Sequence, residues 1–131
     1  MKPQLLIIDD DEQMLKMLVI ALRRSGIDVA TAASGEEGLQ QFAALAPDLV
    51  IVDIAMPLMN GYEVIRRIRQ ADQQGQRAGV IVLTAHTPAM LDYDLDDIEI
   101  DLFLTKPVPP AELLDIIWRV LQDRAGEPLR S

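Results

Sequence analysis

Short runs of hydrophobic residues alternate with longer amphipathic stretches along the whole chain. The runs are continuous rather than alternating with polar residues, and they are rich in Val, Ile and Leu, which is typical of parallel strands buried on both faces. We therefore expect five strands, at residues 5–8, 29–32, 49–52, 80–83 and 100–104. The last is the least regular, because Asp101 lies within it.

The stretches between these runs have the spacing of amphipathic helices. In the first, Leu15, Leu18 and Leu22 share one face, and the pattern stops at Gly26, a common helix terminator. In the second, Ser34 and Glu37 have the spacing of a capping box. We expect helices at residues 12–25, 35–45, 61–72 and 110–122. A further helix between the fourth and fifth strands is the least secure element, because acids crowd residues 92–101.

Regular alternation of strand and helix predicts an α/β fold, a doubly wound parallel sheet with helices on both faces. Ligands of such sheets bind outside the carboxyl ends of the strands. Polar residues follow four of the strands there, namely Asp9 and Asp10, Asp53, Thr84 and Lys106. The topology therefore predicts that three carboxylates, one hydroxyl and one ammonium group meet at one edge of the sheet.

This set of side chains favours phosphoryl transfer. Neighbouring carboxylates repel one another and stay ionised together when a divalent cation offsets their charge, and Mg²⁺ prefers oxygen ligands. A carboxylate is also a competent nucleophile that forms an acyl phosphate. Lys106 and Thr84 are suited to neutralise and hydrogen-bond the oxygens of the transferred group.

Composition narrows the classes of function. The 131 residues fit one domain, which we place at 1–123, with a polar tail at 124–131 that is either a natural end or the start of a linker. The absence of cysteine excludes thiol catalysis and disulfides. A net charge of −9 disfavours direct nucleic-acid binding. With no signal peptide and no membrane-spanning stretch, we expect a cytoplasmic protein.

Four stretches together resemble the signature motifs of the response-regulator receiver domain, a CheY-like family of two-component signalling: LLIIDDDEQ, LVIVDIAMPLMNGYEV, VIVLTAH and LFLTKPV. The likeness covers roughly residues 4–122. It implies a flavodoxin-like (βα)5 three-layer sandwich around a five-stranded parallel sheet. It also implies a phosphorelay switch that takes a phosphoryl group from a phosphohistidine donor, loses it by autodephosphorylation, and is not an enzyme in the ordinary sense.

The resemblance assigns the acceptor and the metal ligands. Asp53 would be the phospho-acceptor. Mg²⁺ would be held by Asp9, Asp10, Asp53 and the backbone carbonyl of Ala55. Asp11 is an extra acid beside the pair, and we interpret it as a bystander. The helix dipole alone could also favour such an acidic cluster at a helix start.

The resemblance also assigns the responding residues. Thr84 would hydrogen-bond the phosphoryl group, Lys106 would pair with it, and Phe103 would be the aromatic switch residue. Phe103 is also expected to be partly core. His86, the only histidine, is expected to lie exposed in a loop. Asn60, where Asp is more usual in the family, is a mild departure.

Partners follow from the same resemblance. The donor would be a sensor histidine kinase or a histidine phosphotransfer protein. We expect it to dock on the first helix through Met14, Met17 and Leu18, unless these residues are ordinary core packing. The output would be a downstream protein or a second copy of the chain. It would bind residues 92–101, the fifth strand and the final helix, where Leu114 and Trp118 form a second apolar strip or pack against the first helix.

Two other classes of function are kept as alternatives. A metal-dependent phosphatase of the haloacid-dehalogenase type also places Asp-x-Asp after its first strand, as Asp9 and Asp11 do, but Gln13 stands where that family has Thr or Val. An interaction module that has lost phosphorylation is disfavoured, because all five expected site residues are present.

Overall fold

A computed structural model describes residues 2–71, 77–87 and 98–124 of the chain. Five strands form one parallel sheet in the order β2-β1-β3-β4-β5. The strands are β1 (Gln4–Ile8), β2 (Asp28–Ala32), β3 (Leu49–Val52), β4 (Gly79–Thr84) and β5 (Leu102–Thr105). The helices of the described residues are α1 (Glu12–Arg23), α2 (Gly35–Leu45), α3 (Gly61–Ala71) and α4 (Pro110–Arg124). The further helix expected before β5 falls on residues 88–97, outside the described residues.

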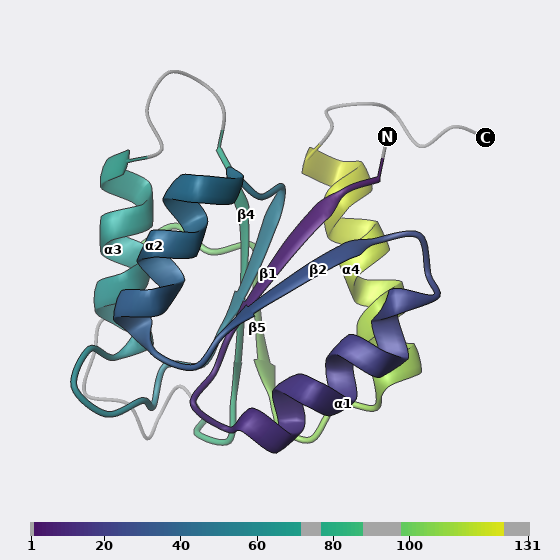
Figure 1. The fold of residues 1–131 in the computed structure, drawn as a ribbon, viewed down its shortest axis with the longest axis horizontal. Coiled ribbons are helices and arrows are strands. Elements are labelled where there is room, and N and C mark those ends of the chain that lie inside the picture. The colour runs from purple at the N-terminus through teal and green to yellow at the C-terminus, as the bar shows by residue number, and fades with distance from the viewer. Residues whose placement is uncertain (1, 72–76, 88–97, 125–131) are drawn as a thin grey trace.

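Helices cover the sheet on both faces. Figure 1 shows α1 and α4 on one face and α2 and α3 on the other. Successive residues of a strand serve opposite layers: Leu5 and Ile7 pack with α1 and α4, whereas Leu6 and Ile8 belong to the cluster on the side of α2 and α3. This two-sided burial explains the continuous hydrophobic runs. It confirms the predicted α/β fold, a flavodoxin-like three-layer sandwich with a five-stranded parallel sheet.

The helix starts follow from local capping. The Ser34 hydroxyl accepts a hydrogen bond from the Glu37 amide at 3.1 Å, as the capping-box spacing predicts. The Glu37 carboxylate in turn accepts from the amide of Ala33, one residue before the cap. Asp11 caps α1 by accepting from the Met14 amide at 3.1 Å.

Two element ends differ from the prediction because of one ion pair. The carboxylate of Asp101 accepts from the Val80 amide at 2.7 Å and from the guanidinium of Arg124 at 2.9 Å. Asp101 therefore precedes β5, which starts at Leu102, and α4 extends to Arg124, into the expected tail. Within the described ranges, no helix is both long enough and apolar enough to cross a membrane.

Candidate functional site

The site lies where the chain switches from one face of the sheet to the other. The connection after β1 leads to α1, and the connection after β3 leads to α3 on the opposite face, so the ends of these two neighbouring strands form the switch point at which such sheets bind ligands. Asp9 and Asp10 follow β1, and Asp53 follows β3, at the lower edge of the sheet in Figure 1. The topology that positions these residues is thus set by buried hydrophobic strands.

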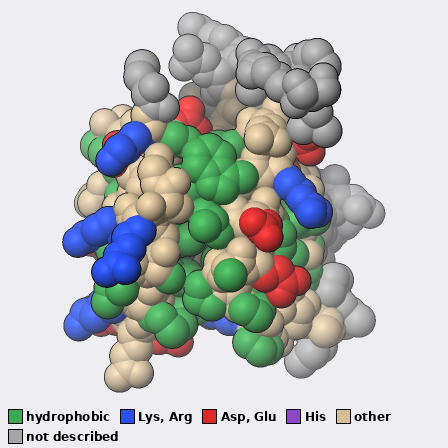
Figure 2. Space-filling view, turned by 90° about the vertical axis from the view of Figure 1, so that its right-hand side faces the viewer, with side chains coloured by type: hydrophobic (Ala, Val, Ile, Leu, Met, Phe, Trp, Pro, Cys, Tyr) green, Lys and Arg blue, Asp and Glu red, His purple; other side chains and the backbone are tan. Residues whose placement is uncertain are grey.

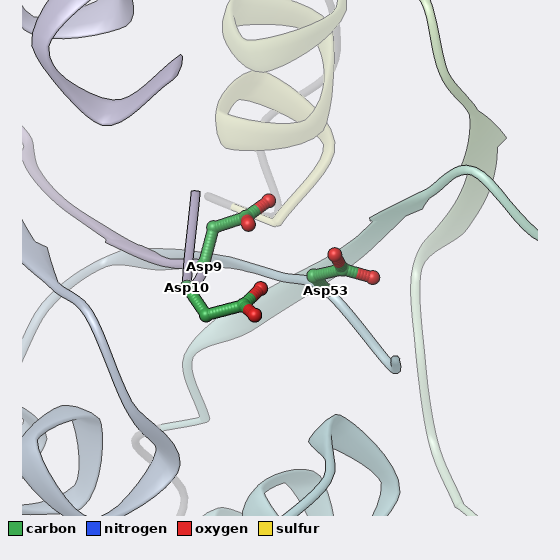
Figure 3. A group of neighbouring side chains, drawn as sticks. All are labelled: Asp9, Asp10 and Asp53. Atoms are coloured by element: carbon green, nitrogen blue, oxygen red, sulfur yellow. The ribbon is translucent and has the colours of Figure 1, made fainter. Parts of the chain in front are cut away.

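The three carboxylates meet as the sequence predicts. One carboxylate oxygen each from Asp9, Asp10 and Asp53 lies within 4.8 Å of the others, and Figure 3 shows the side chains grouped between the two strand ends. Asp9 is 1% exposed and Asp53 is 6% exposed, whereas Asp10 is exposed. The cluster therefore has two buried carboxylates and one carboxylate that faces solvent.

Lys106 reaches the cluster from the end of β5, the edge strand that lies two strands from β3. Its Nζ lies 2.8 Å from Asp9 Oδ2 and 3.3 Å from Asp53 Oδ2. Its backbone amide donates to the carbonyl of Thr84 at 2.7 Å, which holds the residue just beyond β5. Burial by itself lowers the pKa of Lys106, but the hydrogen bond to Asp9 and the charges of Asp53 and Asp9 outweigh it, so the pKa is raised and the ammonium stays charged.

Asp9 is the most constrained carboxyl group of the site. Its burial raises its pKa, and the charge of Asp53 adds to that increase. The hydrogen bonds from Lys106 and from the Asp11 amide, at 2.8 Å and 2.9 Å, oppose the increase without cancelling it. The single positive charge of Lys106 therefore does not balance the negative charge of three carboxylates. A divalent cation bound at the cluster would offset the remaining charge.

The loop after β3 is held against Asp53. Asp53 Oδ1 accepts from the Ala55 amide at 3.1 Å. The Gly61 amide donates to the Ile54 carbonyl at 2.9 Å, and a Cβ at Gly61 would lie 2.3 Å from the Asp53 carbonyl oxygen. Glycine is thus required where α3 starts. The role of the Ala55 carbonyl as a metal ligand stays a prediction.

Thr84 and Phe103 lie on neighbouring strands. Thr84 is fully buried at the end of β4, and Phe103 pairs with Val82 in the register of β4 and β5. Phe103 is half-buried and packs against the core cluster on the side of α2 and α3, as expected. The expectation that His86 is exposed is wrong. Its backbone amide donates to Thr84 Oγ1 at 3.4 Å. Its side chain is half-buried, and the Nδ1 atom is shielded from solvent.

The first helix presents fewer docking residues than expected. Leu18 is 2% exposed and belongs to the core, so its assignment to a docking surface is wrong. Met14 is half-buried against the same core cluster. Met17 and Ile20, at 53% and 74% exposed, are the large apolar residues that α1 leaves open to solvent. The hydrophobic spacing already grouped Leu18 with Leu15 and Leu22, and these three residues form the buried face of the helix.

The final helix buries the stripe that its pattern predicts. Leu113, Ile117 and Val120 are buried in the core. Leu114 and Trp118 are half-buried and pack against the cluster that includes the leucines of α1, which favours packing over a free apolar strip. Figure 2, which views the side of the molecule that carries α1 and α4, shows hydrophobic side chains at the centre of this face, with most of the basic groups along its left edge.

Two acids of the 92–101 segment have partners within the chain. Glu99 lies 2.6 Å from the Arg77 guanidinium, and Asp101 lies 2.9 Å from that of Arg124. These acids are therefore less available to a basic partner than the charge pattern implied. The other acids of the segment lie outside the described residues.

Comparison with known proteins decides the family. The family model of the response regulator receiver domain matches residues 5–118. The chain belongs to this family. The phosphatase alternative has no support, because Asp11 caps α1 and the carboxylate cluster comprises Asp9, Asp10 and Asp53.

The receiver domain has relatives among characterised response regulators. It is 38% identical over 128 residues to the transcriptional regulatory protein AfsQ1 of Streptomyces coelicolor, and the alignment covers 98% of the chain and 52% of the relative. The chain thus spans about half the length of the curated relatives it matches.

Solved structures agree with the fold. A CheY-like receiver domain from Methanospirillum hungatei matches with a TM-score of 0.83 at 26% identity, covering 98% of this chain and 100% of that one. The response regulator TrrA of Thermotoga maritima, solved in complex with Mg²⁺ and BeF, matches with a TM-score of 0.77 at 32% identity, covering 92% and 99%.

Proposed function

We propose that this receiver domain accepts a phosphoryl group on Asp53 from a phosphohistidine donor. The observation that carries the proposal is the position of Lys106, whose ammonium group bridges Asp9 and Asp53 at 2.8 Å and 3.3 Å. A lysine held there offsets negative charge at the point where a phosphoryl group would arrive.

The chemistry is a displacement at phosphorus. A carboxylate oxygen of Asp53 forms a bond to phosphorus while the bond from phosphorus to the donor's imidazole nitrogen breaks, and that nitrogen keeps the electron pair. Lys106 offsets the charge on the phosphoryl oxygens, and the buried Thr84 hydroxyl donates a hydrogen bond to one of them. Hydrolysis of the acyl phosphate would later restore the carboxylate, so the domain acts as an acceptor that assists its own turnover.

The carboxylate cluster fits a magnesium ion. Three oxygen donors within 4.8 Å of one another, one of them exposed, match the preference of Mg²⁺ for a few carboxylates plus water and phosphate oxygen. We propose that Asp9, Asp10 and Asp53 hold the ion. When bound, it would offset charge on the phosphoryl oxygens.

The response would pass through β4 and β5. Thr84 and Lys106 lie at adjoining strand ends, linked by the hydrogen bond between the Lys106 amide and the Thr84 carbonyl. Phosphorylation would draw both side chains toward the phosphoryl group and change the packing of Phe103 on β5. We propose that a downstream protein or a second copy of the chain, rather than nucleic acid, reads this change, because the net charge is −9.

Labelling by acetyl phosphate tests the proposal. The wild-type chain, incubated with acetyl phosphate and Mg²⁺, should gain the mass of one phosphoryl group, and chelation of the metal should prevent this. Borohydride trapping followed by peptide mass spectrometry should locate the label at Asp53. A chain that gains no phosphoryl group, or gains it at another residue, would refute the function.

Met17 provides a test of donor docking on α1. Because its side chain is 53% exposed, Met17→Glu should leave the core intact while placing a charge on the docking face. Transfer from a sensor kinase should slow by about tenfold, whereas labelling by acetyl phosphate should not change. Equal slowing with both donors would instead indicate damage to the acceptor site.

A further inference from the structure

Leu58 combines two features that are unfavourable for a leucine. Its φ of 66° is a left-handed conformation, which residues with a bulky side chain rarely adopt. Its side chain is fully exposed, with a relative accessibility of 105%, so it gains nothing from burial. Ala46, the other non-glycine residue with positive φ in the described ranges, ends α2, where such a conformation is common. Leu58 lies in mid-loop, without that explanation.

The loop that carries Leu58 is braced on both sides. The amides of Met56 and Gly61 both donate to the Ile54 carbonyl, at 3.0 Å and 2.9 Å. Met56 is buried, and Met59 packs against the core cluster. A strained residue persists where its surroundings over-determine its conformation, and such residues cluster at functional sites. Leu58 is therefore presented to solvent from a fixed support.

The position of the loop indicates which partner would meet it. It starts at Asp53 and lies, like the acceptor, at the lower edge of the sheet in Figure 1. Asp53 is only 6% exposed, so a protein that brings a phosphorylated side chain to it must cover the loops around it. A small phosphodonor such as acetyl phosphate is not large enough to contact this loop while it reaches Asp53. A downstream partner that binds β5 and α4 does not need to contact this loop.

We propose that Leu58 is an apolar anchor for the protein phosphodonor and fits between apolar side chains beside the donor's phosphohistidine. The inference rests on the proposed function and names a residue that determines donor specificity. Leu58 would contribute to docking and not to the chemical step. What singles out Leu58 is the strained backbone at an exposed apolar residue close to Asp53, since strained residues cluster at functional sites.

Leu58→Asn separates docking from folding. Asn tolerates the left-handed conformation, so the variant should be at least as stable as wild type in urea denaturation. The donor would be the purified sensor histidine kinase that labels the wild-type chain fastest in a panel. Leu45→Asn is the matched control, because Leu45 is a partly exposed leucine at the end of α2, at the opposite edge of the sheet.

We expect the kcat/KM of phosphotransfer from the kinase to fall by about tenfold in Leu58→Asn, mainly through KM. Labelling by acetyl phosphate should not change, and Leu45→Asn should match wild type with both donors. An unchanged kcat/KM with the kinase would overturn the inference, as would an equal loss with acetyl phosphate or a panel in which no kinase labels wild type. Wild-type chain that acetyl phosphate does not label would refute the proposed function itself, and the inference with it.

Discussion

Replacing Asp53 by Asn should abolish phosphorylation while making the unphosphorylated domain more stable. The amide keeps the size of the carboxylate and can still accept from the Ala55 amide, but it cannot act as the nucleophile. Lys106 retains its contact with Asp9, so the cluster loses one of three neighbouring carboxylates and keeps its ammonium group. We expect the free energy of unfolding to rise by on the order of 1 kcal/mol.

Intact mass after treatment with acetyl phosphate and Mg²⁺ measures the first effect, and urea denaturation measures the second. Mg²⁺ should stabilise the wild-type chain more than the variant, because the variant lacks one proposed ligand. Asp28→Asn is the control, since Asp28 is an exposed carboxylate at the start of β2, away from the site. Phosphorylation of the Asp53 variant, or a loss of its stability, would contradict this account of the cluster.

Gly61→Ala should destabilise the fold and damage the acceptor site together. The added Cβ would lie 2.3 Å from the Asp53 carbonyl oxygen and 2.8 Å from the Ile54 Cα, and backbone atoms cannot move aside as a flexible side chain can. We expect the free energy of unfolding to fall by about 2–3 kcal/mol, as in other overpacked sites. Labelling by acetyl phosphate should slow, because relief of the clash displaces the residue that carries the acceptor.

Gly26→Ala is the informative comparison for this prediction. A Cβ at Gly26 would meet no atom within 4 Å, but the residue has a φ of 85°, which alanine adopts at a cost of about 1–2 kcal/mol. Both variants should therefore lose stability, and only Gly61→Ala should lose phosphorylation. Normal labelling of Gly61→Ala would show that the loop after β3 tolerates displacement.

The sequence by itself determined the fold and which residues form the candidate site. Continuous hydrophobic runs such as that of β3 indicate strands buried on both faces, and parallel strands bring their carboxyl ends to one edge. The carboxylates of Asp9, Asp10 and Asp53 meet for that reason, and the ammonium group of Lys106 joins them. Capping at Ser34 was also predictable, because it depends on residues three positions apart.

Only the tertiary structure decided which side chains are exposed and which charges are paired. Periodicity groups Leu18 with Leu15 and Leu22, but the packing of other elements decides that Met14 is half-buried while Met17 is 53% exposed. The pairing of Asp101 with Arg124 joins residues 23 positions apart. No local pattern encodes such a pairing. The left-handed conformation of Leu58 likewise follows from hydrogen bonds and packing on both sides of its loop, which sequence spacing does not describe.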